Sequence, residues 1–130
     1  MIKTKGQNRI AKKGKNYWAK KGCELAKRIK RETTFSCEIC GKSGNFKREI
    51  HHLLTVGAHK NISNYLPNLI CLCVHCHLFG KISFHGSGTD LMNKKLNKLF
   101  PDRIRKLRQD ALKRKNVNYE AEYEELKRLN

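Results

Sequence analysis

Two pairs of cysteines have the spacing that most clearly predicts chemistry in this sequence of 130 residues. Cys37 and Cys40 form one C-x2-C pair, and Cys73 and Cys76 form a second. A C-x2-C turn places two thiolates on the same side of a tight loop, so two such turns can surround one ion with four sulfur ligands. The alternative is a set of free, buried cysteines. We predict a closed, structural Zn²⁺ site made by the two pairs.

The other two cysteines are not needed for a four-sulfur site. Cys71 is close enough to Cys73 to replace a member of the second pair, but we expect it to lie on a strand with its side chain in the core. Cys23 is predicted to be a free cysteine on a helix. The sequence does not open on an apolar leader segment. We therefore expect a reducing, cytoplasmic compartment, where paired cysteines bind metals rather than form disulfides.

Histidines and one asparagine form a second constellation around the cysteine pairs. His51 and His52 are adjacent near the end of residues 46–54, whose composition predicts a strand. Adjacent strand residues point to opposite faces of a sheet, so these two side chains cannot normally share one task. Asn68 stands at the start of a second predicted strand, and His77 directly follows the last cysteine of the second pair.

The order of these residues resembles that of the HNH (His-Asn-His) endonucleases, the ββα-metal nuclease family. The resemblance covers roughly residues 35–85. It rests on the paired histidines, on an Asn-Leu-Ile strand start, and on a Cys-x2-Cys-His that a second Cys-x2-Cys frames. It implies a small α+β fold in which a hairpin and a helix hold one divalent cation. The predicted zinc site would fasten this core together.

The resemblance also implies a role for each residue of the constellation. In the family, the first of the paired histidines binds the cation and the second is the general base. Carried over, His51 is a metal ligand, and His52 is the base that takes a proton from water near neutral pH. Asn68 braces the loop that presents the base, and His77 completes the metal site.

The cation site implied by the resemblance has one departure from the family. Many members carry another histidine four residues after the Cys-His, where this sequence has Lys81. The next histidine is His85, so either His85 or a water molecule takes that place. The implied reaction is hydrolysis of DNA phosphodiester bonds, as nicks or double-strand breaks. One Mg²⁺, Mn²⁺ or Ni²⁺ ion would stabilise the leaving 3′ oxygen.

A strongly basic composition indicates a polyanionic partner. The chain has 29 Lys and Arg against 11 Asp and Glu, a formal net charge of +18. Such a charge favours nucleic acid, and we expect double-stranded DNA, branched or not, with a homodimer left open. Lys47 and Arg48 beside the histidines, and Arg105 and Arg108 on a predicted helix, are candidate DNA contacts. No apolar run approaches the ~20 residues of a membrane span, so we expect no membrane contact.

The chain divides into four predicted segments. These are a basic flexible arm at 1–15, an N-terminal helix at 16–34, the nuclease core at 35–85 and a C-terminal helical region at 86–130. The core contains the strand at 46–54 and a second strand at 69–73. Helices are expected over about 89–99, 101–115 and 118–129. On the second of these helices, Ile104 and Leu107 should face inward and Arg103 outward.

A second class of function fits the charge and the cysteine pairs equally well. It is a non-catalytic zinc-ribbon protein that binds nucleic acid. Such a binder has no use for the histidine pair combined with Asn68 and His77, which favours the endonuclease. Residues 99–103 loosely resemble the C-terminal regions of phage-borne nucleases. That resemblance indicates a phage or mobile-element source and, with it, the host cytoplasm.

Overall fold

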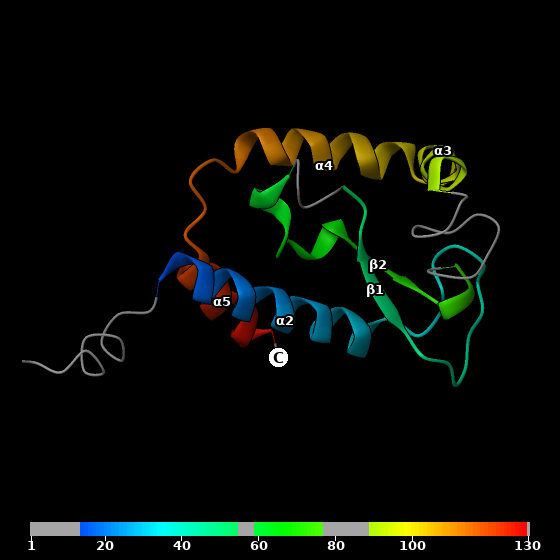
Figure 1. The fold of residues 1–130 in the computed structure, drawn as a ribbon, viewed down its shortest axis with the longest axis horizontal. Coiled ribbons are helices and arrows are strands. Elements are labelled where there is room, and N and C mark those ends of the chain that lie inside the picture. The colour runs from blue at the N-terminus through cyan, green and yellow to red at the C-terminus, as the bar shows by residue number, and fades with distance from the viewer. Residues whose placement is uncertain (1–13, 55–58, 77–88, 130) are drawn as a thin grey trace, which may run out of the picture.

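A computed structural model describes residues 14–54, 59–76 and 89–129, with the backbone alone for 89–93. Within these ranges the chain forms four α-helices and a two-stranded sheet (Figure 1). In chain order the elements are α2 (Lys15–Thr33), β1 (Glu49–His52), η1 (Lys60–Ile62), η2 (Leu66–Asn68), β2 (Leu69–Leu72), α3 (Thr89–Leu99), α4 (Pro101–Lys113) and α5 (Tyr119–Arg128). The predicted small α+β class is therefore confirmed at this level of detail.

The helices begin and end close to their predicted positions, because the sequence carries their start signals. Pro101 occupies the first turn of α4, where its missing N–H would be unpaired anyway. Asn118 caps α5, since its side-chain oxygen accepts a hydrogen bond from the Ala121 N–H at 3.0 Å. Lys15, assigned to the basic arm, is instead the first residue of α2. Within the described ranges, no helix is both long enough and apolar enough to cross a bilayer.

The first strand is shorter than the sequence predicts. The composition favours a strand over 46–54, but β1 has four residues, all paired antiparallel with β2. Because β2 ends at Leu72 and the chain then turns into the second cysteine pair, the residues before β1 have no partner strand. Just after β1, the backbone N–H groups of Leu53 and Leu54 donate hydrogen bonds to Asn68, to its carbonyl oxygen and its side-chain Oδ1 respectively.

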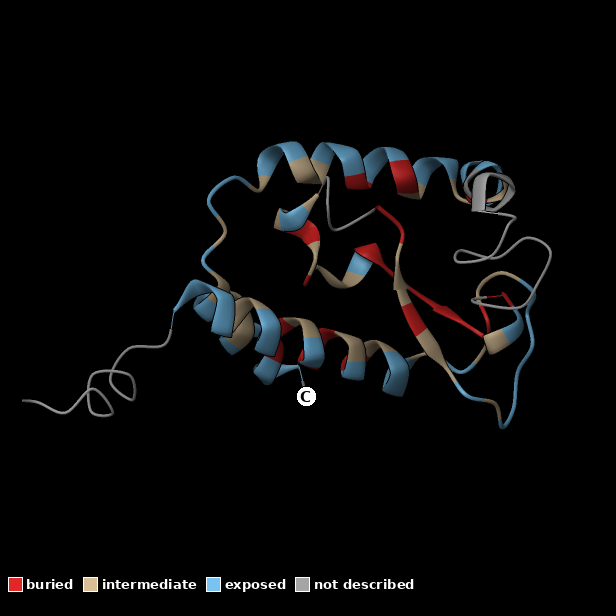
Figure 2. Cartoon of the chain, viewed as in Figure 1, coloured by how far each residue is buried: buried red, intermediate tan, exposed pale blue. Residues whose placement is uncertain are grey.

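The sheet lies between two groups of helices (Figures 1 and 2). On the face toward α2 and α5, the buried apolar residues are Leu25, Ala26, Ile29, Ile50, Leu69, Cys71 and Leu126. On the face toward α3 and α4, they include Leu54, Ile70, Leu72, Leu96, Ile104 and Leu107. Both faces of β2 are thus covered, which is why this strand is apolar and buried at every position.

The segment between the two strands is held on α4 by polar side chains. Asn61 Nδ2 donates hydrogen bonds to the carbonyl oxygens of Ala111 and Arg114, the latter at 3.0 Å. The Tyr65 hydroxyl donates to the Asp110 carboxylate at 2.8 Å. The two Asn61 bonds satisfy backbone carbonyl groups at the C-terminal end of α4, which have no partner inside the helix.

A glycine in the middle of α2 makes room for the same segment. The buried Asn64 side chain donates from Nδ2 to the Ala19 carbonyl at 3.0 Å. A Cβ atom on residue 22 would lie 2.6 Å from Asn64 Nδ2, well inside contact distance. In the sequence alone, Gly22 weakens the prediction of a helix. The structure explains why glycine stands there: Asn64 approaches the helix too closely for any side chain at this position.

Replacing Gly22 with alanine should therefore destabilise the protein, although the same change in an open helix stabilises by up to ~1 kcal/mol. The added Cβ displaces Asn64 from Ala19, which we expect to lower the free energy of unfolding by about 1–3 kcal/mol. Urea denaturation followed by circular dichroism measures the change. Gly14→Ala is the control, because nothing lies within 4 Å of its new Cβ. A Gly22→Ala protein as stable as the Gly14→Ala protein would contradict a tight Asn64 contact.

Candidate functional site

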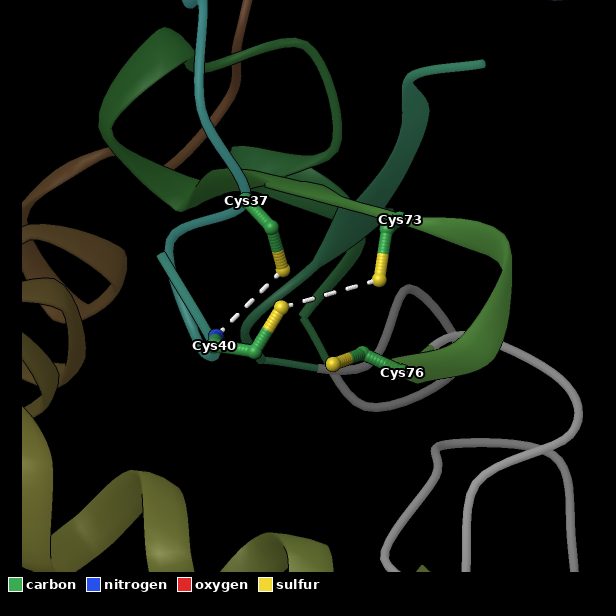
Figure 3. Close-up of side chains that lie close together, drawn as sticks. All are labelled: Cys37, Cys40, Cys73 and Cys76. Carbon is green, nitrogen blue, oxygen red and sulfur yellow. Dashed lines mark hydrogen bonds between the residues drawn. The ribbon is translucent and has the colours of Figure 1, made fainter. Parts of the chain in front are cut away.

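The four cysteines of the two C-x2-C pairs lie together (Figure 3). The sulfur atoms of Cys37, Cys40, Cys73 and Cys76 are all within 4.8 Å of one another, and Cys40 Sγ is 3.8 Å from Cys73 Sγ. Four sulfurs around Zn²⁺, each about 2.3 Å from the ion, are about 3.8 Å apart. The cluster could therefore hold a metal ion, and its donor set is compatible with structural zinc. The predicted grouping of these four residues is confirmed.

Local backbone geometry brings each pair of cysteines to one point. After Cys37 the chain turns back at Gly41, whose φ of 79° lies in the left-handed region that glycine adopts easily. Two backbone hydrogen bonds close this turn, from Gly41 N–H to Cys37 O at 2.9 Å and from Cys37 N–H to Lys42 O at 2.8 Å. The second pair follows β2 directly, and a short helical turn at 74–76 carries the chain to its last cysteine.

The two remaining cysteines lie outside this cluster. Cys71 is fully buried among the apolar residues on the face of the sheet toward α2. Because β2 ends at Leu72, Cys73 leaves the strand and does not share the face of Cys71. The spacing alone left open which of the two is a ligand, and the cluster contains Cys73. Cys23 is half-buried on α2, as expected for a free helical cysteine.

The surroundings of the thiols favour negative charge at one sulfur and oppose it at another. Burial raises the pKa of Cys37, but backbone N–H groups of Cys40, Cys73 and Ile39 hydrogen-bond its sulfur and bring that pKa down to about 7. Burial and hydrogen bonds with the neighbouring thiols raise the pKa of Cys76. A first thiolate is thus stabilised by the backbone, whereas four thiolates together need a cation among them.

Glu38, inside the first cysteine pair, connects the cluster to three other elements. Its Oε2 accepts a hydrogen bond from the Cys71 N–H at 2.6 Å and lies 3.1 Å from Lys30 Nζ on α2. Its Oε1 lies 3.1 Å from Arg103 Nη1 on α4. Burial raises the pKa of this carboxyl, but the Cys71 N–H and the two cations outweigh burial and hold the pKa below its ordinary value. Glu38 is not among the residues that the sequence patterns predict to form a site.

Arg103 turns toward the sheet, not toward solvent as the helical periodicity predicts. Its guanidinium donates to the Leu69 carbonyl at 2.7 Å and to the Pro67 carbonyl at 3.2 Å, in addition to Glu38. A planar group with five N–H donors can reach all three acceptors at once, and this outweighs exposure to water. One sequence signal for this network exists: an acid inside a cysteine pair of a very basic chain.

The two histidines pair with β2 residues that face opposite sides of the sheet. Their own side chains therefore lie on opposite faces, as predicted for adjacent strand positions. His52 Nε2 is 2.8 Å from the Ser63 carbonyl oxygen. Since a carbonyl can only accept, Nε2 carries the proton and Nδ1 is the basic nitrogen of this ring. His51 Nδ1 likewise donates to the His52 carbonyl at 2.9 Å, which makes Nε2 its basic nitrogen.

The environment of His52 keeps its ring neutral. Burial lowers the pKa of the imidazole below its ordinary value, and the positive charge of Lys27 on α2 lowers it further. The hydrogen bond with Ser63 acts in the opposite direction but does not compensate. Near pH 7 the side chain of His52 is therefore an acceptor of protons rather than an imidazolium.

Asn68 closes the segment that carries Ser63. This fully buried side chain accepts a hydrogen bond at Oδ1 from the Leu54 N–H at 2.8 Å. Its Nδ2 donates to the Leu54 and Ile62 carbonyls at 3.1 and 3.3 Å. Because Ile62 directly precedes Ser63, the amide of Asn68 helps to fix the carbonyl that orients His52.

The other predicted site residues have varied surroundings. His77 and His85, the further metal ligands that the resemblance implies, lie outside the described residues. Lys47 is exposed and pairs with Glu49 at 3.5 Å. Arg48 is half-buried and stacks on phenylalanine rings.

The two candidate DNA contacts on α4 are both exposed. Arg105 forms an exposed ion pair with Asp102, one turn earlier on the same helix. Arg108 follows on the same helix, one turn after Arg105. When an exposed cation of this kind binds a phosphate, it gives up little free energy from its existing ion pair, because ion pairs in water are weak.

Comparison of the chain with protein-family models, with curated proteins and with solved structures found no match. The function of this site is therefore inferred from its own residues and geometry, together with the motif resemblance.

Purified protein should carry about one tightly bound zinc ion per chain, because four sulfurs meet at one point. Cys40→Ser should lower the zinc content well below that of the wild type, as measured by elemental mass spectrometry after dialysis. Cys23→Ser and Cys71→Ala, which alter thiols outside the cluster, should retain the metal. Folded wild-type protein without zinc, or equal loss of zinc in all three variants, would contradict the four-cysteine site.

Glu38→Gln should destabilise the protein, because it keeps the shape of the side chain but leaves Lys30 and Arg103 without their shared counter-charge. We expect the free energy of unfolding of the zinc-loaded protein to fall by about 2–4 kcal/mol in urea denaturation. Glu32→Gln breaks only an exposed pair with Arg28 and should cost less than ~0.5 kcal/mol. If the two substitutions had equally small effects, Glu38 would not hold these elements together.

Proposed function

We propose that this protein is a metal-dependent endonuclease of the HNH type that hydrolyses phosphodiester bonds in DNA. We further propose that its four-cysteine cluster binds structural Zn²⁺. The observation that carries the proposal is the orientation of His52 by a segment that Asn68 braces. A histidine whose Nε2–H is held by a carbonyl keeps Nδ1 as its basic nitrogen, which is what a general base in hydrolysis requires.

His52 is the proposed general base. Its Nδ1 accepts a proton from the water molecule that attacks the phosphorus atom, while the Ser63 carbonyl holds the ring in the required tautomer. The products are a 5′-phosphate end and a 3′-hydroxyl end. Asn68 acts through the segment that contains Ser63 and is therefore a positioning residue.

His51 and His77 are the proposed ligands of the catalytic cation, with His85 or a water molecule as a third. The Nδ1–H of His51 is held by a backbone carbonyl, the kind of outer hydrogen bond that orients metal-binding histidines. Imidazole ligands suit Ni²⁺ better than Mg²⁺, although the family resemblance implies that Mg²⁺, Mn²⁺ and Ni²⁺ are all used. When bound, the cation supplies Lewis acidity at the phosphate and at the leaving 3′ oxygen.

The charge of the chain supports a nucleic-acid substrate. A formal net charge of +18 attracts phosphates regardless of base sequence, and the attraction weakens as salt rises. Lys47, Arg105 and Arg108 are exposed and available for such contacts. The zinc cluster joins the segment before β1 to the segment after β2, and so stabilises the hairpin that carries both histidines.

A second candidate is the non-catalytic zinc-ribbon protein that binds nucleic acid. One observation favours it: neither the four-cysteine cluster nor the exposed Arg105 and Arg108 of α4 involves the histidine pair. In that case the hydrogen bond between His52 and Ser63 is only structural. The two candidates predict the same zinc content and similar DNA binding, and they differ in cleavage.

Zinc-loaded protein should convert supercoiled plasmid to open-circular or linear DNA when Mg²⁺, Mn²⁺ or Ni²⁺ is added, as resolved on an agarose gel. His52→Ala should reduce the cleavage rate by about 100-fold or more, the usual contribution of a general base. DNA binding in a gel-shift assay should stay nearly unchanged, because the base is not an anchor for the DNA.

His75→Ala is the matched control for this experiment, because His75 is exposed and lies outside the four-sulfur cluster. It should cleave as the wild type does. Equal cleavage by His52→Ala and the wild type would contradict the role of His52. If zinc-loaded protein bound DNA but cleaved it with none of the three metals, the zinc-ribbon binder would be favoured instead.

A further inference from the structure

Two phenylalanines and an arginine form a cluster on the connection between α2 and β1, with one of the two rings exposed. Arg48 Cζ lies 5.7 Å from the centre of the Phe35 ring and 6.0 Å from the centre of the Phe46 ring. We call these three residues the aromatic–arginine cluster. Both distances are within the range of a cation–π contact. Phe46 is half-buried and packs on the hydrophobic core, so it anchors the cluster to the core.

Phe35 is the outer surface of this cluster. Its side chain is 66% exposed, although burying a phenylalanine is worth about 1.5–3 kcal/mol. A ring exposed in this way gains that free energy when a partner outside the chain covers it. A flat aromatic face beside a guanidinium is a surface on which another planar π-system can stack.

The positive charge of Arg48 is not neutralised within the part of the chain that the structure describes. No carboxylate among those residues lies within ion-pair distance of its guanidinium, and the neighbouring Glu49 pairs with Lys47 instead. Its Nε is buried and has no hydrogen-bond partner among the described residues. The guanidinium is thus positioned by the two rings, and its charge remains available to an anion.

Basic side chains of α2 connect this cluster to the proposed base. Arg31 Nε donates a hydrogen bond to the Arg48 carbonyl at 3.4 Å, which places α2 beside the cluster. Lys27 lies one turn before Arg31 on the same helix, near enough to His52 for its positive charge to lower the pKa of that imidazole. Arg48 and His52 are four positions apart on an extended segment, which spans about 13 Å. A strand of a few nucleotides can cover that distance.

We propose that the aromatic–arginine cluster stacks an unpaired base of a DNA strand whose phosphates run along Arg31 and Lys27 toward His52. The proposal rests on the proposed endonuclease function and specifies its substrate: DNA that contains an unpaired segment. The bases of an intact duplex are stacked on each other and offer no free face to Phe35. An unpaired base has an exposed π-face, and stacking on it does not depend on base identity.

Binding of a fluorescein-labelled oligothymidylate, followed by fluorescence anisotropy, tests this proposal. The zinc-loaded protein is used with no other divalent cation added, so that binding is measured without cleavage. Phe35→Ala should weaken binding of the single strand by about 5- to 150-fold, the range for loss of one base–aromatic stack. Binding of an oligo(dA)·oligo(dT) duplex of the same length should stay nearly unchanged.

Three further variants separate stacking from charge and from folding. Phe35→Trp keeps an aromatic face and should bind the single strand at least as tightly as the wild type. Arg48→Lys keeps the charge but loses the planar group, so it should weaken binding without changing the salt dependence. Leu112→Ala alters another exposed apolar residue, 72% exposed on α4, and should have no effect.

Two results would overturn the proposal. One is that Phe35→Ala, shown to be folded by circular dichroism and zinc content, binds the single strand as the wild type does. The other is that it loses single-strand and duplex binding equally. Since no cleavage is needed here, failure of the plasmid experiment would leave this binding test intact. Failure of the binding test would contradict an unpaired segment in the substrate, but it would leave the proposed endonuclease function standing.

Discussion

The carboxylate of Glu38 is the point at which the separate elements of this protein are joined. From within the first cysteine pair it contacts Lys30 on α2, Arg103 on α4 and the backbone N–H of Cys71 on β2. A chain with a net charge of +18 repels itself when it folds, and a largely buried anion between two cations reverses that repulsion locally. Without it, two positive side chains would face each other beside the cysteine cluster, so the sheet, both helices and the cluster depend on one side chain.

Three asparagines hold the segment between the strands in place by hydrogen bonds, as Glu38 holds the larger elements together. A segment folded against the core must find partners for its backbone groups and for those of its neighbours. Asn61 donates to the end of α4, Asn64 donates to the Ala19 carbonyl on α2, and Asn68 joins Leu54 to Ile62. Ser63 lies within this network, so the carbonyl that orients His52 is fixed by the scaffold. The proposed base is therefore positioned by a partly buried hydrogen bond that the buried bonds of Asn68 support.

The connection between α2 and β1 contributes to each chemical feature of the molecule. It carries the first cysteine pair, Glu38 and the aromatic–arginine cluster, and it leads directly into the strand with the histidine pair. A connection with so little regular structure needs other constraints to hold it. The sulfur cluster and the ion pairs of Glu38 supply them, which links the proposed metal binding to the placement of the surface proposed to bind DNA.

Much of the local structure could be predicted from sequence, because short patterns determine local geometry. The C-x2-C spacing predicted the four-sulfur cluster, strand alternation predicted the opposite faces of His51 and His52, and Pro101 predicted the start of α4. Contacts between distant segments could not be predicted in this way. Glu38 meets Arg103 across 65 residues, and Arg103 leaves the outer face that periodicity assigns to it, because the packing of α4 on the sheet brings several acceptors within reach. The Asn64 contact that requires Gly22, the shortened first strand and the stacking of Arg48 on Phe35 were likewise decided by tertiary structure alone. Sequence by itself determined which residues could do chemistry; packing decided which of them meet, since distance in space depends on how helices lie against the sheet.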